Sequence, residues 1–131
     1  MLRGMPRFFT VEEANALLPE LRETLTQLRE TVDRLQQVEA EVSALRWKAR
    51  GNGHNIPDEP FERRRVLREA AHRHIRRVQE LGCELKDPRM GLVDFPSRRE
   101  NQHVYLCWKL DEAEVSFWHP TDVGFAGRQP L

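Results

Sequence analysis

A leucine-rich seam between Leu18 and Ala49 constrains the fold of this 131-residue chain more than any other feature. Its first six residues alternate steps of three and four, the spacing of an apolar stripe along one side of a helix; they are Leu18, Leu21, Leu25, Leu28, Val32 and Leu35. After one shortened step the seam continues through Val38, Val42, Leu45 and Ala49. The pattern predicts a helix over about residues 11–49, about 60 Å long at 1.5 Å per residue.

Two local signals lie near the start of this helix. Thr10 and Glu13 form the T-x-x-E capping box, in which each side chain accepts a hydrogen bond from a free backbone N–H of the other residue. Pro19 lies inside the apolar run, where it removes one N–H and crowds the preceding turn. We therefore expect a kink or a short break between residues 15 and 19.

A second helix follows a stretch of turn residues. The segment 50–58 is rich in glycine, asparagine and proline, and Asp58 can cap a helix whose first turn tolerates Pro60. The next apolar residues again step by three and four, and Gly82 stands where a left-handed C-cap belongs; the series is Leu67, Ala71, His74, Val78 and Leu81. The sequence predicts a helix over about 59–81, antiparallel to the first.

Charge favours this pairing of the two helices. Residues 12–45 hold eight acidic and three basic side chains, and residues 58–81 hold five acidic side chains and seven arginines. The whole chain carries 21 basic and 21 acidic residues, so no net field attracts nucleic acid or anionic lipid. We expect the arginines to form ion pairs on a solvated face rather than to bind nucleic acid, which remains the weakest of three functional hypotheses.

Beyond Gly82 the apolar period changes from helical to alternating. Four short strands are predicted, in the segments CELKD, GLVDFP, HVYLCWKL and EVSFWH. In the third, Leu106 and Trp108 share the face turned to the helices, whereas Tyr105 and Cys107 share the other. The same parity places Val93, Phe95, Val115, Phe117 and His119 toward the helices, and Trp118 away from them.

These elements make a single α+β domain. We expect a long antiparallel helical hairpin, then a three- to four-stranded antiparallel sheet over about residues 83–119, and an ordered C-terminal strap over 120–131. No apolar run reaches the ~18 residues of a membrane helix, and the first residues lack the apolar stretch of a signal peptide. With only Cys83 and Cys107, we expect a cytoplasmic protein with reduced thiols and no membrane contact.

The order of motifs along the chain resembles a known family. The segments FFTVEEANALLPELR, LGCELKDPRMGLVDFP, VYLCWKL and WHPTDVGFAGRQPL are similar to DUF2203, a bacterial family of uncharacterised small proteins. The resemblance covers nearly the whole chain and carries no activity to transfer. It implies that the following residues belong to the family's motifs: Glu84, Leu85, Lys86, Asp87, Gly91, Asp94, Phe95, Trp108, Trp118, His119, Gly124 and Arg128.

Polar residues of the sheet and the strap form the candidate ligand site. Its members are Glu84, Lys86, Asp87, Asp94, His119 and Arg128. His119 is held extended by Pro120, and Arg128 can bind a ligand bidentately or pair with Asp94 or Glu84 within a packed strap.

We expect no metal or cofactor, because the chain has no C-x-x-C or H-E-x-x-H motif and the parity separates Cys107 from His119. The alternative metal set is His119, Asp122 and Asp94. No serine lies in a nucleophile elbow, and Cys107 has no evident activating base.

The leading functional hypothesis is a non-catalytic assembly or binding module that forms a homodimer through its helices. A single hairpin leaves part of its apolar seam uncovered, with Trp47 beside it, and Leu92, Tyr105 and Trp118 add apolar surface on the sheet. The second hypothesis is an enzyme or metal-binding protein whose site lies on the sheet and the C-terminal motif.

Overall fold

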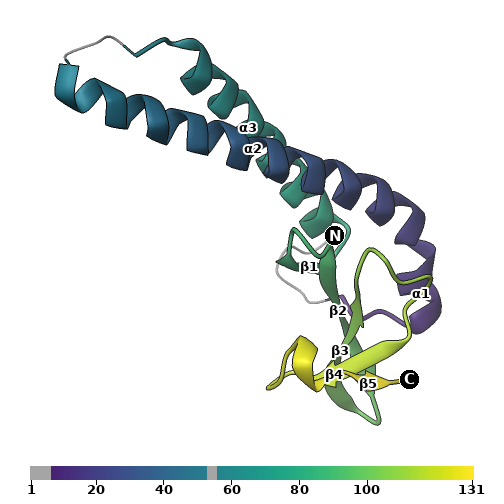
Figure 1. Cartoon of the computed structure of the whole chain (residues 1–131). Coiled ribbons are helices and arrows are strands. Elements are labelled where there is room, and N and C mark those ends of the chain that lie inside the picture. The colour runs from purple at the N-terminus through teal and green to yellow at the C-terminus, as the bar shows by residue number, and fades with distance from the viewer. Residues whose placement is uncertain (1–6, 53–55) are drawn as a thin grey trace.

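The computed structural model describes residues 7–52 and 56–131, without the side chains of residues 51 and 52. Three helices precede a five-stranded antiparallel sheet in which the strands lie in sequence order. The helices are α1 (Val11–Ala16), α2 (Leu18–Asn52) and α3 (Glu59–Glu80). Figure 1 shows α2 and α3 as a long hairpin that extends away from the sheet, whereas α1 lies beside it. None of the described helices is long and apolar enough to cross a membrane.

The helix ends follow the local sequence signals closely. The capping box of Thr10 and Glu13 is present, and the predicted break falls at Leu17, between α1 and α2. Pro19 is thereby the second residue of α2, where its missing N–H has no helical partner to lose. α2 runs three residues beyond its predicted end, and residues 53–55 of the predicted turn lie outside the described part of the chain.

The start and end of α3 differ in how well the sequence predicted them. Asp58 precedes α3 but makes no side-chain capping hydrogen bond, because its own backbone is already helical. Gly82, after the last turn, has φ +95°, a conformation that glycine adopts without strain. The N–H of Gly82 donates to the carbonyl of Gln79, which closes the helix end.

The apolar seam of α2 is buried as its spacing predicts. Its fully buried members are Leu18, Leu21, Leu25, Leu28, Val38 and Val42. Ion pairs between the helices flank the seam, including Arg77 with Glu20 and Arg63 with Glu41. Arg64 and Arg68 both approach Glu39. The acidic first helix and the arginine-rich second helix therefore neutralise each other within one chain.

The sheet has one strand more than predicted. Its strands are β1 (Glu84–Asp87), β2 (Leu92–Arg99), β3 (Gln102–Trp108), β4 (Phe117–Pro120) and the short β5 (Gln129–Pro130). β2 and β3 are joined by Glu100 and Asn101 alone, both with positive φ, as a tight two-residue hairpin requires. The 3-10 helix η1 (Phe125–Gly127) and β5 bring the C-terminal segment back onto β4.

The inner face of the sheet packs on the helices. Val93, Phe95, Leu106 and Trp108 lie in one core cluster with residues of α1, α2 and α3. Val115 joins this cluster, and Trp118 packs against it. The parity predicted for the inward-facing residues of β2 and β3 is thus confirmed.

The parity predicted for β4 is wrong. Phe117 pairs with Cys107 and Trp118 with Leu106, so Phe117 and His119 share the outer face with Cys107, and Trp118 faces the core. The reason lies at Val115, which precedes the strand. Its N–H donates to the side chain of Asn15 rather than to a strand, so the alternation counted from Val115 does not continue into β4.

Candidate functional site

Three adjacent strands bring one aspartate, one cysteine and one histidine together on the outer face. Asp94 of β2 lies opposite Cys107 of β3, and His119 of β4 lies opposite Tyr105, two residues from Cys107 on the same face. One ligand atom from each residue can be chosen so that all lie within 4.8 Å of one another. We call Asp94, Cys107 and His119 the outer-face cluster. All three are buried, with exposed fractions of 3%, 0% and 2% respectively.

The ring of His119 is held at both of its nitrogens. Its Nδ1 lies 2.8 Å from the carbonyl oxygen of Pro120, and its Nε2 lies 3.0 Å from Oδ2 of Asp94. A carbonyl oxygen only accepts hydrogen bonds, so Nδ1 carries a proton. A carboxylate also only accepts, so a neutral ring would turn the lone pair of Nε2 toward an oxygen. The contact between Nε2 and Oδ2 therefore holds either a hydrogen-bonding proton or a metal ion.

Of the other two members of the cluster, Asp94 has an oxygen atom without a hydrogen bond in the described part of the chain, and Cys107 has a thiol with a raised pKa. Oδ1 of Asp94 is buried and has no hydrogen-bond partner among the described residues. Burial raises the pKa of the Cys107 thiol to about 12, and the nearby Asp94 carboxylate contributes to this increase. A buried carboxylate oxygen without a donor is costly, which marks this position as more than a structural contact.

Glu84, Lys86 and Tyr105 form a polar rim beside the cluster. Glu84 pairs with Asp94 across β1 and β2, and Nζ of Lys86 donates to Glu84 at 3.0 Å. Burial raises the pKa of Glu84, but hydrogen bonds from Lys86 and Tyr105 outweigh it and hold that pKa below its usual value. The hydrogen bond to Glu84 is also the largest cause that raises the pKa of Tyr105 to about 12. The rim is thus a closed set of partners around one carboxylate.

A pocket of about 250 Å³ lies between this rim and the C-terminal segment. Its polar lining includes Lys86, Asp94, Tyr105, His119 and Thr121. Its other walls are Leu92, Val123, Gly124 and Phe125, so the C-terminal segment covers the outer face like a strap. A ligand in this pocket would touch two members of the outer-face cluster.

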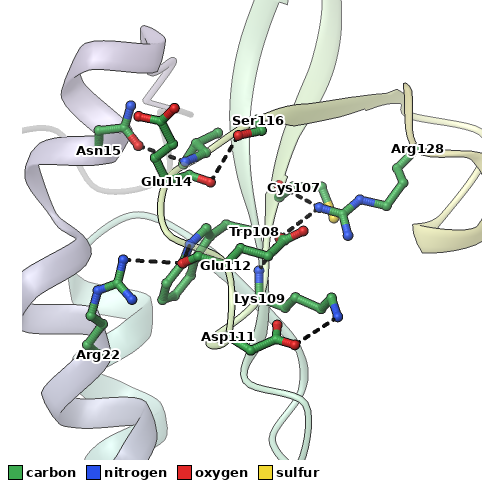
Figure 2. A network of polar contacts seen from close by, with 11 residues as sticks. Asn15, Arg22, Cys107, Trp108, Lys109, Asp111, Glu112, Glu114, Ser116 and Arg128 are labelled. Carbon is green, nitrogen blue, oxygen red and sulfur yellow. Dashed lines mark hydrogen bonds and ion pairs between the residues drawn. The ribbon is translucent and has the colours of Figure 1, made fainter. Parts of the chain in front are cut away.

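Arg128 lies near the cluster but belongs to a different network. Its Nη2 donates to Oε1 of Glu112 at 2.8 Å and to the carbonyl of Cys107 at 3.4 Å, as Figure 2 shows. Its guanidinium also lies over the rings of Phe117 and Phe125. The partners expected for a packed strap, Asp94 and Glu84, are therefore replaced by Glu112.

Glu112 organises the whole connection between β3 and β4. Its side chain accepts from the N–H of Lys109, and its carbonyl accepts from Trp108 and Arg22. Figure 2 shows these contacts. At the end of the connection, the N–H of Val115 donates to the side chain of Asn15. The network holds residues 109–116 in an irregular conformation. This conformation determines which residues of β4 face outward, and so places His119 on the outer face.

Two sequence-predicted residues lie apart from the cluster. Oδ1 of Asp87 accepts from the N–H groups of Arg89 and Met90, so this side chain shapes the turn between β1 and β2. Asp122 is exposed and is not among the described residues that could jointly hold a metal ion. The structure brings together Glu84, Lys86, Asp94 and His119 from the predicted set and adds Cys107.

The full length of the described chain matches one known family. A family model described as an uncharacterized conserved protein, DUF2203, matches residues 7–131. The chain belongs to the DUF2203 family. No curated protein and no solved structure gives a significant match. The resemblance seen in the motifs is confirmed, and the function of this DUF2203 member must be argued from its own site.

Proposed function

We propose that this DUF2203 protein is a non-catalytic binding protein whose ligand site is the outer-face cluster and the pocket beside it. The observation that carries the proposal is the Asp94 carboxylate. It is buried, one of its oxygens lacks a donor among the described residues, and the pocket reaches it. A group that costs stability and adjoins a pocket is typical of a binding site.

The surroundings of each reactive group favour binding over catalysis. Both ring nitrogens of His119 face oxygen atoms of the protein, and the residue is buried, which disfavours proton exchange with a substrate. Burial raises the pKa of both thiols, Cys83 and Cys107, to about 12, which disfavours the thiolate that a nucleophile needs. Lys86 is already paired with Glu84.

Native mass spectrometry of protein purified without chelators or an affinity tag tests this proposal. We expect wild-type protein to carry a bound species and Asp94→Asn to lose it, because the substitution removes the buried charge while keeping the side-chain shape. Asp122→Asn is the matched control, since Asp122 is an exposed carboxylate of the strap.

The opposite result is also specific. Wild-type protein with the mass of the bare chain contradicts the proposal if its melting temperature is also unchanged by small acids, amines and divalent metal ions. A bound species that is retained in Asp94→Asn places the ligand elsewhere and contradicts it as well.

Self-association through the helical hairpin is the second candidate function. Trp47 on α2 is 72% exposed and Val66 on α3 is 49% exposed, so each helix of the hairpin presents a large apolar side chain to solvent. A second hairpin packed against these helices would form a four-helix bundle. The arginines of α3 are largely engaged in ion pairs, which favours a protein partner over nucleic acid.

Sedimentation equilibrium at micromolar concentration tests self-association. We expect a dimer for wild-type protein and for Trp108→Phe, whose tryptophan is buried in the core, and weaker association for Trp47→Ser with Val66→Ser. A monomeric wild-type protein would rule out the homodimer without affecting the outer-face cluster.

A further inference from the structure

We infer that the ligand of the outer-face cluster is a divalent transition-metal ion of the zinc class, bound by the Asp94 carboxylate, the Cys107 sulfur and Nε2 of His119. The inference rests on the proposed function, because it names the ligand of the same site. It goes beyond the pocket alone, since Cys107 does not line the pocket but completes the set of donor atoms.

Two ligand atoms of the cluster face each other across a position that a cation can occupy. Nε2 of His119 and Oδ2 of Asp94 face each other at 3.0 Å, and Nδ1 is committed to the carbonyl of Pro120. A metal ion near Nε2 and the carboxylate would be bound by lone pairs of both side chains. It also gives Asp94 a second bond, which offsets the cost of the Oδ1 atom that has no partner among the described residues.

The contact between His119 and Pro120 is the outer-sphere bond that metal-binding histidines use. Such a histidine donates its other ring N–H to a carbonyl or carboxylate, which fixes the tautomer and the ring direction. Here the carbonyl belongs to Pro120, the next residue and the last residue of β4. Nε2 is thereby presented as a ligand before any ion arrives.

The distances in the cluster fit a single ion after a small adjustment. Zn²⁺ binds nitrogen and oxygen at about 2.0–2.2 Å and sulfur at about 2.3 Å, so tetrahedral ligand atoms lie roughly 3.3–3.8 Å apart. The three ligand atoms lie within 4.8 Å of one another, and Nε2 of His119 and Oδ2 of Asp94 are 3.0 Å apart. Side-chain rotations that separate Nε2 and Oδ2 by roughly 0.3 Å more and keep the Cys107 sulfur near both would complete the site on the three paired strands.

The chemistry of the donors selects the class of ion. A thiolate and an imidazole with one carboxylate suit Zn²⁺ and Co²⁺, whereas Mg²⁺ and Ca²⁺ require oxygen ligands. Three protein ligands leave a fourth position, which in such sites is taken by water or an exogenous molecule. The adjacent pocket, reached from Asp94 and His119, has the volume for this ligand.

Titration of the chelator-treated protein with Co²⁺ tests the inference directly. A cobalt–thiolate bond gives a charge-transfer absorption band, so the spectrum reports whether Cys107 binds the ion. We expect one Co²⁺ per chain with this band in wild-type protein, and displacement of the Co²⁺ by Zn²⁺. Cys107→Ser removes the band, and Asp94→Asn weakens Co²⁺ binding by more than about 100-fold, beyond the loss typical of an outer-sphere residue.

Cys83→Ser is the matched control. Cys83 is equally buried, and its thiol has a similarly raised pKa, but it lies in the apolar core and donates to the carbonyl of Val78. We expect the cobalt–thiolate band to remain in this variant. A band that disappears in Cys83→Ser and persists in Cys107→Ser overturns the inference.

The remaining outcomes separate this inference from the proposed function. One Co²⁺ per chain without the thiolate band overturns the three-ligand site, as does the absence of stoichiometric binding. If native mass spectrometry then shows an organic ligand that Asp94→Asn loses, the binding function stands and the metal inference fails. If neither metal nor organic ligand is found, both fail.

Discussion

Both faces of the sheet contain fully buried side chains, but of different chemistry. On the inner face, Val93 and Phe95 are fully buried among apolar side chains of the helices. On the outer face, Asp94 and His119 are almost as fully buried, yet they are polar and one carboxylate oxygen lacks a donor among the described residues. Burial alone therefore does not identify a structural core.

The difference between the faces shows how this small domain combines stability with a site. Apolar burial on the inner face stabilises the fold in proportion to the area removed from water. The outer-face cluster lowers stability, because buried polar groups without full partners are unfavourable. Residues that reduce stability at a pocket are typical of functional sites.

Removal of a large inner-face side chain should have the greatest effect. Phe95→Ala leaves a cavity at a fully buried position of the core cluster. We expect the free energy of unfolding to fall by about 3–5 kcal/mol, measured by urea denaturation. A loss below about 1 kcal/mol would mean that the inner face is not the principal source of stability.

Two glycines compare the edge of the inner face with the strap over the outer face. Gly91 has φ +63°, and an added Cβ would lie 2.6 Å from Cβ of Leu110, which packs on the core. Gly91→Ala should therefore destabilise the protein by about 1–3 kcal/mol. An added Cβ at Gly124 meets nothing within 4 Å, so Gly124→Ala should change stability by less than about 0.5 kcal/mol. Equal losses of stability for the two variants in thermal unfolding would contradict this expected difference.

The inner-face thiol should make stability fall at high pH. Burial raises the pKa of Cys83 from its ordinary value of 9.0 to about 12, so the folded protein keeps a proton that the unfolded chain loses. The free energy of unfolding should fall as pH rises from about 9 toward 12, by up to about 1.4 kcal/mol per pH unit. Urea midpoints between pH 8 and 10.5 should depend less steeply on pH in Cys83→Ala. An unchanged slope would show that Cys83 does not contribute.

An ion pair on the hairpin, outside both faces, should have the smallest effect. Arg63 and Glu41 are 2.9 Å apart with both side chains substantially exposed. Glu41→Gln should change the free energy of unfolding by less than about 1 kcal/mol, because exposed pairs are screened by water. Glu30→Gln, at an exposed acidic residue of the same helix, is the control. A loss much larger than this limit would give the hairpin charges a structural role.

The sequence predicted the helices and the inner face because their signals are local and periodic. The seam of Leu21, Leu25 and Leu28 and the alternation around Leu106 each specify a buried side without reference to distant residues. The start of α1 followed from the capping box, and the break before Leu18 followed from Pro19, for the same reason.

The outer-face cluster could only be predicted in part. Glu84, Lys86 and Asp94 were expected together from strand pairing, and the structure places them side by side. Cys107 was separated from His119 because strand parity was counted from Val115 across residues that form no strand. The path of these residues depends on contacts from Asn15 and Arg22, about one hundred positions earlier in the chain, which no local pattern reveals.

The stability of Asp94→Asn, measured beside its Co²⁺ binding, tests the division between the faces most directly. In the presence of a chelator, the asparagine amide can donate to Nε2 of His119, which keeps a hydrogen bond between the two side chains without the carboxylate. We predict a free energy of unfolding within about 1 kcal/mol of wild-type protein, or higher, together with loss of Co²⁺ binding. A loss of stability as large as that of Phe95→Ala, with Co²⁺ binding unchanged or absent in both proteins, would contradict the account and make the outer-face cluster part of the structural core.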